Sequence, residues 1–155
     1  MRLLVLLLSG FAAALAACSD APAEAQGPGG YDADSVERLM VGTIEPAAAL
    51  IWNSVSTTIS VAGVEETYPR TDQEWAAVRR SAVRLGDAGK SLITGSRSRN
   101  GGDWANRARQ LIAAADETVK AADGKSPDAI LEAGEKIYSA CLGCHQRYPG
   151  RMQNE

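Results

Sequence analysis

The feature that most constrains the fold of this chain is the sequence Cys-Leu-Gly-Cys-His at residues 141–145. A C-x-x-C-H pattern is typical of covalent haem c attachment. Two thiols three positions apart lie on one face of a helix, where each can add to a vinyl group of the porphyrin. The adjacent imidazole can then bind the iron as its proximal axial ligand. The pattern therefore predicts one covalent haem c held by Cys141 and Cys144, with His145, the only histidine, on the iron.

The same cysteines have other interpretations. A structural zinc site usually takes four Cys or His ligands, and Cys18 is the only further candidate ligand in the chain. A thioredoxin-type dithiol accompanies a βαβ pattern, which this sequence does not show. A third alternative is a structural lipoprotein in which Cys141 and Cys144 form an incidental disulfide. The spacing and the adjacent His145 favour haem attachment over all three.

Residues 1–17 have the features of a secretory signal peptide: Arg2, an apolar run at residues 3–8, and small residues before Cys18. The apolar run is too short for a membrane span, which needs about 20 residues. Residues 15–18, Leu-Ala-Ala-Cys, resemble the lipobox of bacterial lipoproteins. That resemblance implies cleavage before Cys18, acylation of this cysteine and stable anchoring to a membrane. Ser19 implies a periplasm-facing lipoprotein, on the outer rather than the inner membrane.

Residues 18–33 are expected to be the lipidated cysteine and a flexible tether, since Ala, Pro, Gly and acidic residues dominate there. Residues 34–155 are long enough for one domain with its own core. With Cys18 acylated and the other two cysteines on haem, no thiol is left for a disulfide. The chain is acidic, with 16 Lys and Arg against 19 Asp and Glu, so a nucleic-acid partner is not expected.

The first of four amphipathic stretches runs from Asp34 to Ile59, with apolar residues at spacings of three, four and seven. Asp34 and Glu37 form a candidate capping box at its start. Pro46 lies inside the stretch and predicts a kink near residues 42–45, because proline removes a backbone hydrogen bond. The expected apolar stripe is Val36, Met40, Ala47, Ile51, Val55 and Ile59.

Three more helices follow, and Trp52 is expected to pack in the core between them. Residues 63–69 are expected to be a loop. The residues expected to begin the helices are Thr71 with Glu74, Asp103, and Ser126 with Pro127, and Gly124 is expected to end the third helix. Four helices with short connections and no strand pattern predict an all-α fold. The expected architecture is an antiparallel four-helix bundle with haem c near the C-terminal end of the fourth helix.

A C-x-x-C-H sequence on the last of four helices, in an exported chain of this size, resembles the cytochrome c prime family of class II c-type cytochromes. The resemblance covers residues 34–148. It implies that Cys141 and Cys144 make the thioethers and that His145 is the proximal ligand. Tyr148 matches a common aromatic position of the family. The chain departs from the family at Pro149, where a basic residue often follows the aromatic.

The resemblance also implies that a residue of the first helix covers the distal face of the haem. Met40 lies on the apolar stripe, and Leu39 or Ile44 could take this place instead. Arg38 lies on the other side of the helix from Met40, so the propionate contact of the family's first-helix arginine is not carried over to it. Many members of the family dimerise, which leaves a homodimer open for this chain.

Two functions follow from this reading, and neither makes the chain an enzyme, because no nucleophile set remains once His145 binds iron. The first is transfer of single electrons to and from a redox partner protein. The second is binding of nitric oxide or carbon monoxide at a five-coordinate iron. Met1 leaves with the signal peptide, and Met152 lies beyond Pro149 on the proximal side, so Met40 is the candidate thioether ligand. It either binds the iron or covers an open site.

Overall fold

The computed structural model describes residues 31–99 and 101–149. The predicted signal peptide, Cys18, most of the tether and Met152 lie outside these ranges. The elements, in chain order, are α1 (Ala33–Leu39), the π-helix η1 (Met40–Ile44), α2 (Glu45–Ser54), β1 (Ser56–Ser60), β2 (Gly63–Thr67), α3 (Asp72–Leu92), the 3₁₀ turn η2 (Gly95–Arg97), α4 (Gly102–Asp123) and α5 (Pro127–Arg147).

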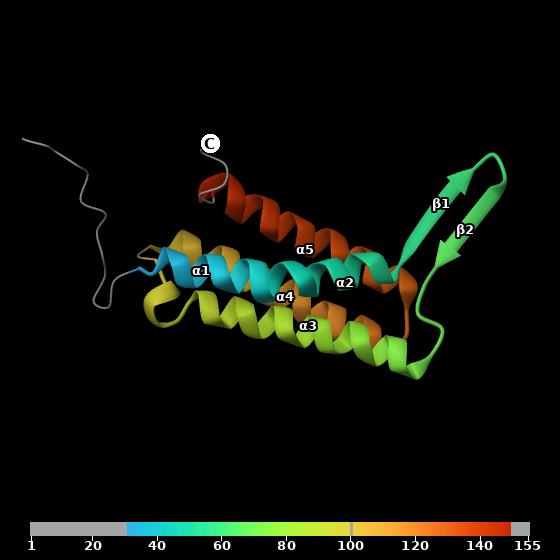
Figure 1. Ribbon diagram of the computed structural model, residues 1–155, viewed down its shortest axis with the longest axis horizontal. Helices are drawn as coiled ribbons and strands as arrows, with labels where there is room; N and C mark the ends of the chain where they lie inside the picture. Colours follow the sequence, from blue (N-terminus) through green and yellow to red (C-terminus); the bar gives the residue numbers. More distant parts are fainter. Residues whose placement is uncertain (1–30, 100, 150–155) are drawn as a thin grey trace, which may run out of the picture.

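The described part of the chain is mostly helical, with four helical segments packed in sequence order and one small hairpin. The first segment is the continuous run of α1, η1 and α2, and α3, α4 and α5 are the other three. Successive segments run in alternating directions, and the β1–β2 hairpin projects from one end (Figure 1). The prediction of four helices is therefore confirmed, whereas the hairpin was not predicted.

The first helical segment begins one residue earlier than predicted, with a different cap. Asp32 Oδ1 accepts a hydrogen bond of 2.9 Å from the Ser35 backbone N–H, so the predicted Asp34–Glu37 capping box is wrong. The predicted disturbance before Pro46 takes the form of the π turn η1, in which the Glu45 N–H donates to the Met40 carbonyl. Pro46 has no N–H to donate, so a regular helical ladder cannot continue into it.

The hairpin corrects two predictions made for residues 55–69. The helix ends at Ser54, and Val55 is already extended, with φ −138° and ψ 135°. Ile59 therefore lies on β1 rather than on a helical stripe, and β2 replaces the expected loop at residues 63–67. β-Branched residues at 55 and 57–59 favour this extended backbone, because their side chains lose freedom in a helix.

The starts of the other helices are predicted correctly in two of three cases. Thr71 and Glu74 form the expected capping box of α3, and Ser126 caps α5 with Pro127 in its first turn. Helix α4 instead starts after Gly101, whose φ of +111° favours glycine. Asp103 lies in the first turn of α4 and is not its cap, so that prediction is wrong.

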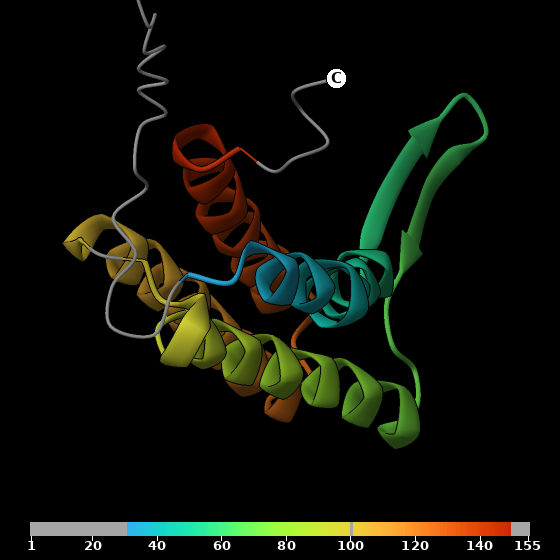
Figure 2. The same cartoon turned by 60° about the vertical axis from the view of Figure 1, so that its left-hand side comes forward.

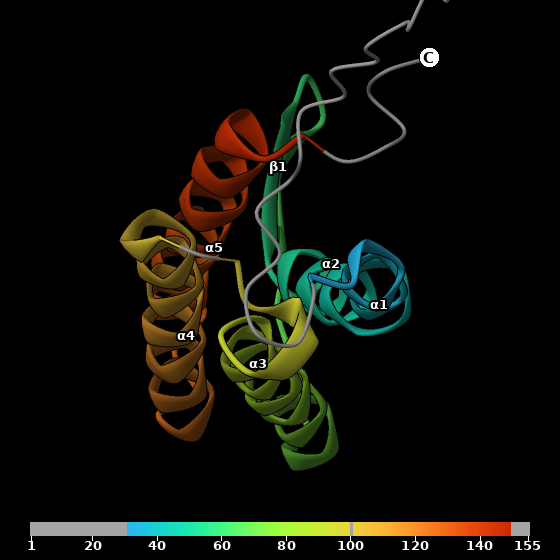
Figure 3. The same ribbon diagram turned by 90° about the vertical axis from the view of Figure 1, so that its left-hand side faces the viewer.

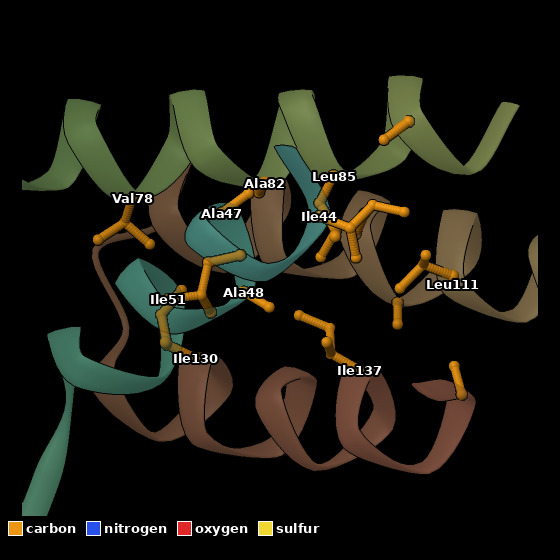
Figure 4. Close-up of a cluster of buried hydrophobic side chains, with 14 of the residues drawn as sticks. Ile44, Ala47, Ala48, Ile51, Val78, Ala82, Leu85, Leu111, Ile130 and Ile137 are labelled. Atoms are coloured by element: carbon orange, nitrogen blue, oxygen red, sulfur yellow. The ribbon is translucent and has the colours of Figure 1, made fainter. Parts of the chain in front are cut away.

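The core lies between the helices and includes four of the six residues predicted as the first stripe: Val36, Ala47, Ile51 and Val55. Figure 4 shows side chains from α2, α3, α4 and α5 pointing toward one another. Among the largest fully buried side chains are Ile51, Leu85, Ile130 and Ile137. Trp52 is not part of this core, contrary to expectation, because 41% of it is exposed. Its Nε1 donates a 3.1 Å hydrogen bond to the Gly134 carbonyl and so joins α2 to α5.

Helix α5 packs closely against α4 and sparsely against α2. The two views of Figures 1 and 3 agree that the C-terminal half of α5 diverges from α1. The residues of the C-x-x-C-H sequence lie in this half. In the ranges the structure describes, no helix combines the length and the apolar character needed to cross a membrane.

Candidate functional site

The predicted site residues meet at one small cavity. Met40 of η1 and three residues of α5, Cys141, Cys144 and His145, line a space of about 30 Å³. By volume this holds about two water molecules. The remaining lining residues are Ile44, Leu92, Trp104, Arg107, Ala108, Leu111 and Ala140. The fold thus brings together residues that are about 100 positions apart in the sequence, from the first and the last helical segments.

The two thiols of the motif are half-buried and do not form a disulfide. Burial raises the pKa of Cys141 above its ordinary value. The pKa of Cys144 is also raised, first by burial and then by the nearby Cys141 and Asp103, while Arg107 and Arg99 oppose the shift. Both groups are therefore protonated thiols at neutral pH when nothing is attached to them.

His145 lies in the last turn of α5 and is exposed, although it also contributes to the cavity wall. A ligand held through the thiols of Cys141 and Cys144 would therefore have an imidazole beside it on the same helix. This is the donor set that covalent haem c attachment requires: two thiols and one nitrogen ligand.

The residues considered for the distal face differ in their position relative to the cavity. Met40 is half-buried and Ile44 is 5% exposed, and both line the cavity. Leu39 packs against the core and is not among the lining residues. Arg38 points to solvent, with 70% of its side chain exposed, and its Nη2 lies 3.9 Å from Asp32 Oδ2. The structure therefore places Met40 and Ile44, rather than Leu39 or Arg38, at this site.

Arg107 is the main site residue that the sequence analysis missed. A Cβ atom added to Gly143 would lie only 2.6 Å from Arg107 Nη1, so the guanidinium rests on the backbone between the two cysteines. The Nε of Arg107 also lies 3.6 Å from Oδ1 of Asp103, which is one turn earlier on α4. The sequence held a signal for it, because positions 104, 107, 108 and 111 share one helical face. The other three of these positions carry the apolar residues Trp104, Ala108 and Leu111.

An aromatic cluster joins the end of α5 to the start of α4 behind the cavity. The rings of Tyr148 and Trp104 meet edge to face, with their centroids 5.0 Å apart. The rings of Tyr31 and Trp104 also meet edge to face, with a centroid distance of 6.1 Å. The Arg99 guanidinium lies 5.2 Å from the Tyr148 ring centroid and 4.3 Å from that of Tyr31. A cation therefore lies over Tyr148, although Pro149 follows it in the sequence. Tyr31, which the sequence analysis placed in the tether, packs against the hydrophobic core.

Over residues 31–99 and 101–149, no group of three or more His, Cys, Asp and Glu side chains is arranged to hold a metal ion.

Family models, curated proteins and solved structures were all compared with the chain, and none of them matches it.

Proposed function

We propose that this protein is a membrane-anchored c-type cytochrome that transfers single electrons. The observation that carries the proposal is the convergence of Cys141, Cys144, His145 and Met40 on one cavity. In this proposal the fold is an antiparallel four-helix bundle that holds haem at the C-terminal end of α5. Cys18 anchors the chain to the periplasmic face of the outer membrane, and a redox protein is its partner.

The side chains present fit haem c by their chemistry. Cys141 and Cys144 would hold the porphyrin through thioethers, and His145 would bind the iron from the same helix. When bound, haem iron supplies a one-electron couple between its ferric and ferrous states. The protein contributes a partly buried environment, and Arg107 contributes a positive charge beside the motif that favours the reduced, less positive iron centre electrostatically.

The cavity of about 30 Å³ is far smaller than a porphyrin, so haem binding has to widen it. The packing of the helices supports widening on one side. Helix α5 packs closely on α4 but only sparsely on the first helical segment, and it already diverges from α1 (Figure 1). We therefore expect α5 or the side chains of η1 to move outward when haem is attached.

The second candidate function is binding of nitric oxide or carbon monoxide, and the apolar part of the lining favours it. Ile44, Leu92 and Leu111 surround Met40 with aliphatic surface. Such a pocket would admit a small uncharged gas if Met40 did not bind the iron. The two candidates therefore differ in one respect, which is whether the thioether of Met40 occupies the sixth coordination position.

We predict that the haem-loaded parent protein is six-coordinate and low-spin, and that Met40→Ala converts it to a high-spin, five-coordinate form. The reason is that, among the residues the structure describes, Met40 supplies the only thioether at the cavity. Absorption spectra of the oxidised and reduced proteins measure this change. Leu39→Ala is the control, since Leu39 precedes Met40 in the same segment but does not line the cavity.

Three outcomes separate the possibilities. Loss of the low-spin spectrum in Met40→Ala alone supports the electron carrier. A high-spin parent that binds carbon monoxide without displacing a ligand supports the gas-binding function instead. If the parent is low-spin and Met40→Ala keeps that spectrum unchanged, Met40 is not the ligand, and the electron-carrier proposal loses its structural basis.

A further inference from the structure

The β1–β2 hairpin is the part of the described structure that packs least against the rest of the fold. All ten residues of its strands are exposed, and the strands form a two-stranded sheet that projects from the helices (Figure 2). The large apolar side chains Ile59 and Val64 are 80% and 65% exposed. A two-stranded hairpin is marginally stable in water unless it gains further strands or packs on a helix. The hairpin therefore lacks a partner within residues 31–99 and 101–149.

The two edges of the hairpin differ in charge. Proteins protect free strand edges with charged residues, prolines or bulges. β2 carries Glu65 and Glu66, which oppose pairing with another acidic strand. β1 reads Ser-Thr-Thr-Ile-Ser and has neither a charge nor a proline, and its register with β2 runs without a bulge from Ser56 to Ser60. The β1 edge is therefore the unprotected one.

The register also fixes which backbone groups of β1 point outward. Ser60 pairs with Gly63 across a two-residue loop, so Ser60, Thr58 and Ser56 direct their N–H and C=O groups toward β2. Thr57 and Ile59 then direct theirs to the free edge. When two β1 strands run antiparallel about Thr58, Thr57 of each copy meets Ile59 of the other, and both residues have outward N–H and C=O groups.

We propose that the β1 edge pairs with the β1 edge of a second copy of this chain, forming a four-stranded antiparallel sheet across a two-fold axis at Thr58. The proposal commits to a second copy because the edge is self-complementary in hydrogen bonding and neutral in charge. Pairing through β2 would instead bring Glu66 toward a second acidic strand. Thr58 faces Thr58 at the axis, and cross-strand threonine pairs are favourable. The proposal does not depend on haem.

Cysteine cross-linking of the full-length protein tests the register. In the proposed sheet the two copies of Thr58 form a non-hydrogen-bonded pair, with Cα atoms about 4.5 Å apart, which suits a disulfide. Thr58→Cys should therefore give a dimer band on a non-reducing gel after mild oxidation. Glu65→Cys is the matched control, because Glu65 is paired with Thr58 but lies one strand further from the axis. The unmodified parent reports any dimer formed by its own cysteines.

Charge reversal gives a second test in the Thr58→Cys background. Ser56 of one copy faces Ser60 of the other, so Ser56→Glu with Ser60→Glu places like charges opposite each other and should abolish the cross-link. Co-expression with Thr58→Cys copies carrying lysine at both positions should restore it as a mixed dimer. The proposal is overturned if Thr58→Cys gives no dimer, if Glu65→Cys cross-links equally well, or if the paired glutamates leave the cross-link unchanged.

Discussion

At the scale of single residues, the surroundings of Cys141 and Cys144 explain why both thiols stay protonated at neutral pH. Cys141 and Cys144 lie half-buried beside each other on α5, and burial favours their neutral form. Arg107 rests on the backbone between them and partly offsets this effect at Cys144. Protonated thiols oxidise and exchange slowly, because the thiolate is the reactive form. In the proposed function, this would protect the unloaded chain from a disulfide that blocks haem attachment.

The raised thiol pKa values predict a pH dependence of stability in the haem-free protein. The unfolded cysteines ionise near their ordinary pKa of 9.0, whereas the folded ones keep their protons to higher pH. Unfolding therefore releases protons in this range, and the free energy of unfolding falls as the pH rises through about 9. Urea unfolding between pH 7 and 10 measures the slope for the parent and for the Cys141→Ala/Cys144→Ala variant.

The variant without these cysteines should lose less stability over the same pH range, since alanine does not ionise. Groups such as Lys90 and Lys136 are present in both proteins and cancel in the comparison. Coinciding slopes for the two proteins would mean that the thiols are not perturbed by folding.

Among the elements, those with strong local signals were predicted well and those without them were not. The capping box of Thr71 and Glu74 and the Ser126–Pro127 start fix α3 and α5 through nearby side chains and backbone, so the sequence was sufficient. The hairpin was missed because all its strand residues are exposed, which leaves no buried face to produce an alternating pattern. Ile59 also lies four positions after Val55, a spacing that imitates a helix.

The same distinction applies to the site. Cys141, Cys144 and His145 were predicted from their local spacing, which is the spacing that the proposed haem attachment would require. Helical spacing could place Arg107 on the apolar face of α4, but its position on Gly143 and the contact between Trp104 and Tyr148 depend on how α4 packs against α5. Trp52 was misplaced for a similar reason. Its hydrogen bond to the Gly134 carbonyl allows the indole to stay at the surface, and that bond joins residues 82 positions apart.

Two glycines of α3 provide a prediction about the packing of α3 on α4. A Cβ at Gly89 would lie 2.8 Å from Ile112 Cγ1, whereas a Cβ at Gly86 would make an ordinary 3.5 Å contact with Ala115. Alanine favours a helix by about 1 kcal/mol over glycine, and overpacking costs about 1–3 kcal/mol. We expect Gly86→Ala to raise the free energy of unfolding by up to about 1 kcal/mol. Gly89→Ala should lower it by about 1 kcal/mol.

Chemical denaturation of the two variants beside the parent measures these changes, and each variant serves as the control for the other. The two positions lie one turn apart on the same buried face, so they differ mainly in the neighbour that the added methyl group meets. A Gly89→Ala variant as stable as Gly86→Ala would show that α3 and α4 pack less closely at Gly89 than the 2.8 Å distance to Ile112 Cγ1 implies.

At the scale of the whole molecule, some helices pack against each other more closely than others. α3, α4 and α5 pack closely in sequence order, and the first helical segment rests mainly on α3. The cavity is lined by this segment, by α4 and by the end of α5, with Leu92 of α3 also in its wall. A large cofactor attached to α5 can therefore be accommodated by moving one side of the molecule, while the α3–α4 core stays in place.

The central claim is that Cys141 and Cys144 hold haem covalently, and a haem stain of the mature protein on a denaturing gel tests it most directly. Denaturation removes haem that is bound by coordination alone, so a stained band reports thioether bonds. We predict a stained band for the parent and for Cys18→Ser, the matched cysteine variant outside the site. The Cys141→Ala/Cys144→Ala variant should show no stain at equal protein. Full haem retention by that double variant, or no stain in the parent exported from a host that matures c-type cytochromes, would contradict the account.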